Sequence, residues 1–124
     1  MVSHSVARRL ILQYLSAWED QSVEQIRTLF TVDAHYHEYL FSAPLVGVVA
    51  IEQYWFEKVV SEQRDITTAL KNVFVDGDTI IAEFVAYAYS IVKNKELRLQ
   101  SICVCTVSGE KLSSYREYWH SAWR

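Results

Sequence analysis

The fold of this chain is decided at one junction, Leu29-Phe30-Thr31-Val32-Asp33-Ala34-His35-Tyr36-His37-Glu38-Tyr39, which is closed by Ala43-Pro44-Leu45-Val46-Gly47. Residues before the junction repeat with the period of a helix, whereas nearly all residues after Arg64 alternate as strands do. The first strand is predicted over His35 to Phe41, with one face made by Tyr36, Glu38 and Leu40 and the other by His35, His37 and Tyr39. Pro44 breaks this strand because proline cannot donate to a ladder.

Three helices are predicted around this strand. The first covers Ser3 to Asp20, where apolar or aromatic residues recur every four positions, at Val6, Leu10, Tyr14 and Trp18. The second begins at Ser22 with Gln25 three residues on, which is typical of a capping box, and ends near Val32-Asp33. Gly47 precedes the third, at about Val49 to Glu62, whose apolar stripe includes Ile51, Tyr54, Trp55 and Val59.

The rest of the chain predicts an antiparallel meander of four strands. They cover Asp65–Val75, Thr79–Val92, Leu97–Val107 and Leu112 to Trp119 or beyond. Asp76-Gly77 is a strong signal for a two-residue hairpin in which both residues need a positive φ. Polar turns at residues 93–96 and 108–111 predict the other two hairpins.

The element order α-α-β-α-β-β-β-β predicts an α+β fold within one domain, residues 1–124. Each helix has one apolar face to bury, so we expect all three on the concave side of a strongly curved antiparallel sheet. Such a cone-shaped α+β barrel has a natural pocket at its wide end.

Composition excludes several classes of function. The net charge is −3 and the basic residues form no stripe, so we expect no binding to nucleic acid or to an anionic membrane. No apolar run approaches the ~20 residues of a membrane helix. The only cysteines, Cys103 and Cys105, lie too far apart along a strand for a disulfide, and no signal peptide is seen. We therefore expect a cytoplasmic protein.

Several short motifs make the chain similar to the nuclear transport factor two-like superfamily, which includes SnoaL-like polyketide cyclases and ketosteroid isomerases. They are Tyr14-Leu15-x-x-Trp18, Leu29-Phe30-x-x-Asp33-Ala34, Pro44-x-x-Gly47, Asp76-Gly77-Asp78, and Ser108-Gly109-Glu110-Lys111 before a final Tyr- and Trp-rich strand. The resemblance covers essentially the whole chain. It implies the cystatin-like fold described above, which hosts enzymes, binding modules and adaptors.

The resemblance also implies roles for individual residues. The tyrosine with which ketosteroid isomerases donate to the substrate oxyanion falls on Tyr14, and their aspartate base falls on Glu38. Their protonated aspartate falls on Cys103, whose thiol is a much weaker donor, so steroid isomerisation itself is not supported. Matching the later strands to the family pattern turns Glu83, Val85, Tyr87 and Tyr89 inward, followed by Ser101, Cys103 and Cys105, and then by Tyr115, Glu117 and Trp119.

The predicted pocket therefore combines a carboxylate base, Glu38, and a phenol donor, Tyr14, with a ligand-binding wall. That wall contains Trp18, Tyr36, Trp55, Glu83, Tyr87, Cys103, Tyr115, Glu117 and Trp119. Carboxylates among apolar walls have raised pKa values and serve as general acids or bases, and phenols stabilise oxyanions. We expect a small apolar organic ligand and, as one hypothesis, an isomerase, cyclase, dehydratase or hydrolase without a cofactor.

Other interpretations of the same residues stay open. Glu38, Glu83 and Glu117 could instead pair with Arg98, Arg116 or tyrosine hydroxyls, which would make the chain a non-catalytic ligand-binding or dimerisation module. His35 and His37 could offer two imidazoles to a metal, but no third ligand is evident, and we expect no metal. Aromatic residues on both faces of the last strand, with Ile102 and Val104 nearby, predict a homodimer through the sheet.

Overall fold

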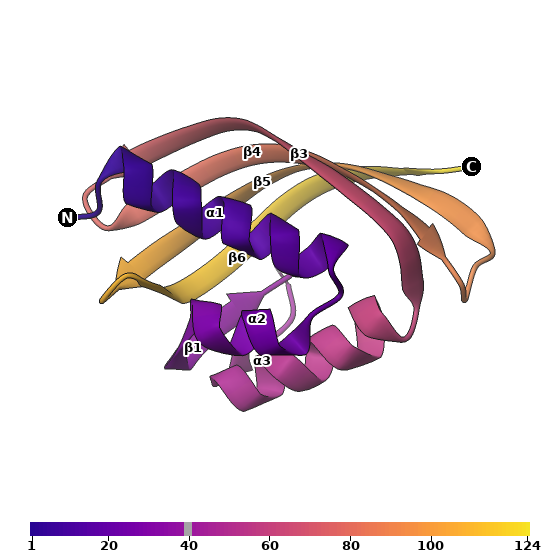
Figure 1. Ribbon diagram of the computed structural model, residues 1–124, viewed down its shortest axis with the longest axis horizontal. Helices are drawn as coiled ribbons and strands as arrows, with labels where there is room; N and C mark the ends of the chain where they lie inside the picture. The colour runs from indigo at the N-terminus through magenta and orange to yellow at the C-terminus, as the bar shows by residue number, and fades with distance from the viewer. Residues whose placement is uncertain (39–40) are drawn as a thin grey trace.

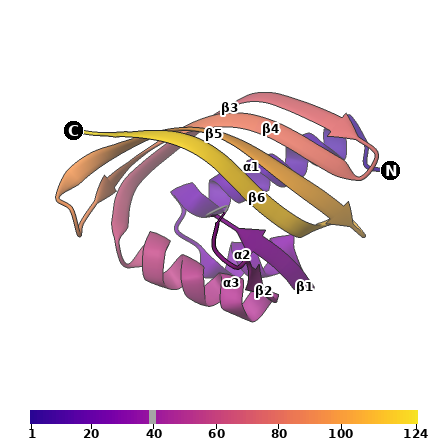
Figure 2. The ribbon, with the colours of Figure 1, turned by 180° about the vertical axis from the view of Figure 1, so that it is seen from behind.

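The sheet of this protein arches over its helices, as Figure 1 shows. The computed structural model describes residues 1–38 and 41–124, and its strand order is β2-β1-β6-β5-β4-β3. The elements are α1 (His4–Glu19), α2 (Val23–Leu29), β1 (Phe30–His37), β2 (Leu45–Val46), α3 (Val48–Trp55), the π-helical η1 (Phe56–Val60), β3 (Gln63–Asp76), β4 (Thr79–Ser90), β5 (Lys95–Ser108) and β6 (Lys111–Trp123). Seen from behind in Figure 2, α1, α2 and α3 all lie beneath the curved strands, which confirms the predicted α+β class. None of the described helices is long and apolar enough to cross a membrane.

The sheet is mixed, not wholly antiparallel as predicted. Strands β3 to β6 form the expected meander, but β1 runs parallel to β6, with Tyr36 opposite Tyr115. Hairpins force their strands to run antiparallel, whereas β1 and β6 are separated in the chain by β2, α3, η1 and the strands β3 to β5. The alternation of apolar and polar residues does not indicate whether two strands so distant in the sequence run parallel or antiparallel.

Strand β1 begins at Phe30, five residues before the predicted start, and α2 ends correspondingly early at Leu29. Phe30 already has extended backbone angles, and its side chain is buried as if it continued the strand face of Ala34 and Tyr36. The register of β1 against β6 shifts between Phe30 and His35, so the strand is irregular just after the end of α2. Glu38 follows the strand directly, while the predicted positions Tyr39 and Leu40 lie outside the described residues.

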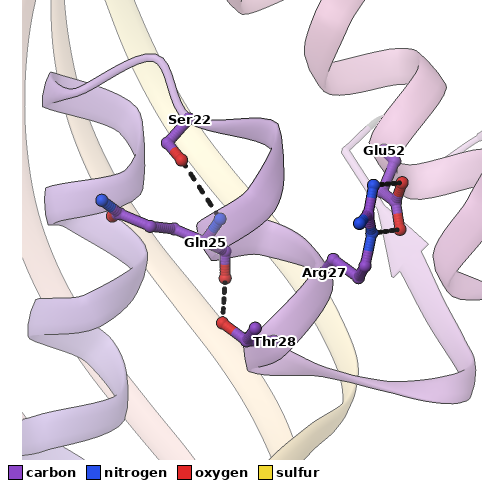
Figure 3. Close-up of polar contacts among 5 residues, drawn as sticks. All are labelled: Ser22, Gln25, Arg27, Thr28 and Glu52. Atoms are coloured by element: carbon purple, nitrogen blue, oxygen red, sulfur yellow. Dashed lines mark hydrogen bonds and ion pairs between the residues drawn. The ribbon is translucent and has the colours of Figure 1, made fainter.

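Of the two hydrogen bonds of the predicted capping box of α2, one is confirmed. The Ser22 hydroxyl accepts a hydrogen bond from the Gln25 backbone N–H at 3.1 Å, as Figure 3 shows. The Gln25 side chain does not return the bond but donates to Asp20, while the Ser22 N–H donates to the Ala17 carbonyl. In the same figure the Arg27 guanidinium makes two hydrogen bonds, of 3.0 and 3.1 Å, to the Glu52 carboxylate and so joins α2 to α3.

The first hairpin turns one residue later than predicted. Asp76 pairs with Thr79, so the turn consists of Gly77 and Asp78, and only Gly77 has a positive φ, of 62°. Gly47 also has a positive φ, of 93°, where its N–H donates to the Ala34 carbonyl at 2.8 Å. This bond fastens the start of α3 to β1.

The inner face of β4 is rich in small side chains. Its buried residues are Ile80, Ala82, Phe84, Ala86, Ala88 and Ser90, and they face the helices. Phe84 is fully buried and packs edge-on against Trp18 of α1, with ring centroids 6.3 Å apart. Towards the end of β4, Ala88 and Ser90 leave room that no large side chain fills, and a cavity opens there.

Candidate functional site

A cavity of about 490 Å³ lies between the sheet and the C-terminal halves of α1 and α3. Strands β4, β5 and β6 form one wall, while α1, α3, η1 and the residues at the end of β1 form the other. Its lining includes most of the predicted pocket residues, namely Tyr14, Trp18, Tyr36, Glu38, Trp55, Glu117 and Trp119.

Two predicted lining residues, Cys103 and Tyr115, are buried in the core beside the cavity without lining it. The prediction that Ser101, Cys103 and Cys105 face inward is confirmed, because all three side chains are buried. Both cysteines are free thiols, and burial raises the pKa of Cys105 well above its ordinary value.

The prediction that Glu83 and Tyr87 face inward is wrong. Both lie on the outer, exposed face of β4, where Asn72 donates to the Glu83 carboxylate at 2.6 Å. A shift of one residue in the alternation of a strand turns every side chain to the opposite face. Both faces of β4 carry apolar residues, so the sequence pattern does not indicate which face is buried.

Three tyrosines form a stack at the inner end of the cavity. The Tyr115 ring lies 4.6 Å from that of Tyr14 and 4.9 Å from that of Tyr36, measured between centroids, and both contacts are stacked. The hydroxyls of Tyr14 and Tyr36 are hydrogen-bonded at 2.8 Å. Burial raises the pKa of Tyr14 well above its ordinary value, and the charge of Glu117 raises it further. Tyr14 therefore keeps its proton at neutral pH and can donate it in a hydrogen bond.

Glu117 is a buried residue whose two carboxyl oxygens each accept a hydrogen bond from a hydroxyl group. Tyr115 donates to Oε1, and Ser101 donates to Oε2 at 3.2 Å. Burial raises the pKa of Glu117, and the two hydroxyls oppose that change because they stabilise the charged form. Of the partners suggested by the sequence, the structure provides a tyrosine hydroxyl, while Arg116 donates to Tyr118 instead.

Glu38 lines the same cavity from the end of β1. Burial, and after it the negative charge of Glu117, raise the pKa of Glu38 to about 7, while the positive charge of Lys58 opposes them. Lys58 itself is paired with Glu62 at 3.3 Å. A carboxylate with a pKa near neutrality gains and loses a proton readily at physiological pH, as a general base must.

Sequence reasoning missed several residues of the site. Tyr54 was expected only in the apolar stripe of the third helix, but it lines the cavity with its ring 5.5 Å from that of Tyr36. Gln63 also lines the cavity and accepts a hydrogen bond of 2.9 Å from the Trp18 indole. Lys93, from a predicted polar turn, places its ammonium 4.3 Å from the ring centroid of Trp123. Helical spacing identified Tyr54 as inward-facing. Gln63 and Lys93 reach the cavity only because η1 and the β4–β5 loop pack at its edge, which the spacing of residues does not indicate.

The two histidines of the junction, His35 and His37, do not line the cavity. His35 is exposed, and the His37 ring is hydrogen-bonded to the Ser42 carbonyl. Across residues 1–38 and 41–124, no group of three or more histidine, cysteine or acidic side chains could hold a metal ion.

Comparison with known proteins gives both a sequence family and structural neighbours. Residues 11–115 match the model of the SnoaL-like domain. No curated protein sequence is significantly similar to the chain.

The structural neighbours share the fold at low sequence identity. The epoxide hydrolase/cyclase-like enzyme SalBIII, described for its role in pyran ring formation in the polyether salinomycin, is 18% identical, with a TM-score of 0.82 over 97% of this chain and 95% of its own. A putative isomerase from Bacillus subtilis is 20% identical, with a TM-score of 0.80 over 97% of this chain and 90% of its own. A protein from Catenulispora acidiphila with a ketosteroid isomerase-like fold, in complex with trimethylamine, is 16% identical, with a TM-score of 0.78 over 88% of this chain and 83% of its own.

Proposed function

The chain belongs to the SnoaL-like domain family, and from that premise we propose that its cavity binds a small organic molecule and acts on it by acid–base chemistry without a cofactor. One observation carries the proposal. A carboxylate with a pKa of about 7, Glu38, lines a cavity of about 490 Å³ together with the protonated phenol of Tyr14.

In the proposed reaction Glu38 is the base and Tyr14 is the donor. Glu38 removes a proton from a carbon beside a carbonyl, and the carbonyl oxygen takes up the negative charge. The Tyr14 hydroxyl donates a hydrogen bond to that oxygen, and its bond to Tyr36 holds it in place. Protonated Glu38 then returns the proton to a different carbon, which completes an isomerisation and restores the base.

The same pair suits the opening of an epoxide. Glu38 takes a proton from water or from a substrate hydroxyl while the oxygen of that group bonds to a ring carbon. The C–O bond of the epoxide breaks, and its oxygen keeps the electron pair as an alkoxide that accepts a hydrogen bond from Tyr14. Protonated Glu38 then returns the proton to the alkoxide, directly or through water, which restores the base. That reaction class fits SalBIII, which is named as epoxide hydrolase/cyclase-like, whereas the isomerisation fits the neighbour from Bacillus subtilis. Both neighbours support the class of chemistry and leave the substrate open.

The proposal is tested by comparing turnover of a panel of ketones and epoxides by the wild type, Glu38→Gln and Tyr14→Phe. Loss of a general base typically costs about 10²- to 10⁴-fold in rate, so Glu38→Gln should lose most of the activity. The matched control is Glu83→Gln, which removes a carboxylate from the outer face of the sheet and should leave turnover unchanged. Equal turnover by the wild type and Glu38→Gln would contradict the role of Glu38.

A second candidate, a non-catalytic ligand-binding module, is favoured by one observation. The position expected to supply a second oxyanion donor, Cys103, is buried beside the cavity and does not line it. In that case ligands would raise the melting temperature without being converted. The panel distinguishes the two candidates, because a binder gives a thermal shift on a substrate that mass spectrometry recovers unchanged.

The outer face of the sheet is proposed to pair with a second copy of the chain. Exposed apolar and aromatic residues gather there, at Phe74, Ile81, Tyr87, Ile102 and Tyr118. Ile102 lies between Glu83 and Tyr118 on neighbouring strands, near the middle of the sheet. Ile102→Glu should convert a dimer into a monomer in light scattering, whereas Val32→Glu, at an exposed position of β1, should not. The two buried free thiols fit a reducing compartment, and we propose the cytoplasm.

A further inference from the structure

The inner part of the cavity holds two carboxyl groups, Glu38 and Glu117, and no positive group of the described residues forms an ion pair with either. Glu117 is about 9% exposed, and its two oxygens are hydrogen-bonded only to neutral hydroxyls, those of Tyr115 and Ser101. Among residues 1–38 and 41–124, no lysine, arginine or histidine lies within ion-pair distance of Glu117 or Glu38. A cation bound beside these two carboxyls would stabilise their ionised forms, which burial alone disfavours.

Two lysines line the cavity, and each already has a partner near the rim. Lys58 is paired with Glu62, and both side chains remain partly exposed. The Lys93 ammonium lies over the ring of Trp123, a residue of the open end of the cavity that is 40% exposed. Neither lysine therefore neutralises the two inner carboxylates by direct contact.

The walls around these carboxylates are aromatic. Tyr36, Tyr54, Trp18, Trp55 and Trp119 all line the cavity. The electron-rich faces of such rings attract cations, most strongly where water is excluded, and they stabilise organic cations that carry no hydrogen-bond donors. Aromatic walls beside a carboxyl group that has no cationic partner make a site of the kind that selects ammonium groups.

We propose that the ligand of this cavity carries an organic ammonium group, which binds beside Glu117 among the aromatic side chains. This inference deepens the proposed function, on which it rests, by naming the substrate class as amines or quaternary ammonium compounds. Glu117 is then the residue that binds the cation, and Glu38 remains free to exchange protons with the rest of the molecule. The positive charge also favours the ionised form of Glu38, which is the form that acts as a base.

The experiment compares benzyltrimethylammonium with neopentylbenzene, in which a carbon replaces the charged nitrogen. Binding is followed by the fluorescence of the tryptophans that line the cavity. The two molecules have nearly the same shape, so any preference reports the charge. Wild-type protein should bind the cation about tenfold or more tightly than the neutral molecule. Glu117→Gln should remove that preference, while Glu83→Gln on the outer face should keep it.

A second measurement guards against misfolding of the Glu117→Gln variant. Near neutral pH the bound cation should displace the proton from Glu38 of the wild type, and calorimetry in buffers of different ionisation enthalpy counts the protons released. Glu38→Gln should abolish this release. Equal affinity for the two probes, no binding of either, or a preference that survives Glu117→Gln would overturn the inference. In those cases Glu38-dependent turnover of neutral ketones or epoxides would still support the proposed function.

Discussion

Replacing Glu38 by glutamine should make the protein more stable above neutral pH and leave its stability in acid nearly unchanged. The pKa of Glu38 rises from 4.5 to about 7 on folding, chiefly because the fold removes much of the water around the carboxylate, and further because of the negative charge of Glu117. Between these two values the folded protein binds a proton that the unfolded chain does not. The free energy of unfolding must therefore fall as the pH rises from about 4.5 to about 7.

The size of the effect follows from the shift. A change of about 2.5 pKa units corresponds to roughly 3 kcal/mol at about 1.36 kcal/mol per unit. The Glu38 side chain is only half-buried, so solvent screening reduces this figure, and we expect about 1 to 3 kcal/mol. Below about pH 4.5 the carboxyl is neutral in both states, and glutamine is a close substitute.

The assay is urea unfolding, followed by tryptophan fluorescence at several pH values between about 4.5 and 8. The unfolding free energy of Glu38→Gln minus that of the wild type should grow with pH through this range and level off above about 7. Glu117 titrates in the same direction in both proteins, and the subtraction removes most of its contribution. The control, Glu83→Gln, should run parallel to the wild type. A difference that stays constant with pH would refute the burial argument for Glu38.

Three further predictions concern the core, the α2 cap and the tyrosine stack. Phe84→Ala should lower the free energy of unfolding by about 3 to 5 kcal/mol, because Phe84 is fully buried against Trp18, while Phe74→Ala on the exposed face should cost far less in the same urea assay. Ser22→Ala should cost about 1 kcal/mol by chemical denaturation, since it leaves the Gln25 N–H without its cap, and an unchanged midpoint would contradict that role. Tyr115→Phe removes a hydroxyl donor to Glu117 and should raise the pKa of that carboxyl further, as seen in its infrared band during a pH titration; a lower pKa would contradict the hydrogen bond.

Much of the fold could be predicted because its signals are local. The helical spacing of Tyr14 and Trp18 placed both residues on the buried face of the first helix, and Ser22 was found by its capping pattern. The turns near Gly77 and Gly109 located two hairpins and hence the meander. Each of these features depends on residues within a few positions of one another, where propensity and hydrogen bonding decide the outcome.

The candidate site was predicted only in part because its residues come from separate elements. The orientation of β4 could not be read from a strand with two apolar faces, so Glu83 and Tyr87 were placed on the wrong side. Nothing in the local pattern near Tyr115 indicated that its ring would stack between those of Tyr14 and Tyr36. Packing between distant segments decides both, and sequence spacing does not encode it.

The sequence by itself determined the helix and strand types, the meander and the presence of acidic and aromatic residues at the junction of residues 29–47. Only the tertiary structure decided that β1 runs parallel to β6 and that Glu38 and Glu117 line one cavity. The physical reason is that backbone preferences depend on residues close in the sequence. Desolvation and charge interactions depend instead on groups that the fold brings together from distant parts of the chain. The raised pKa of Glu38 is therefore a property of the folded chain and not of its sequence neighbours.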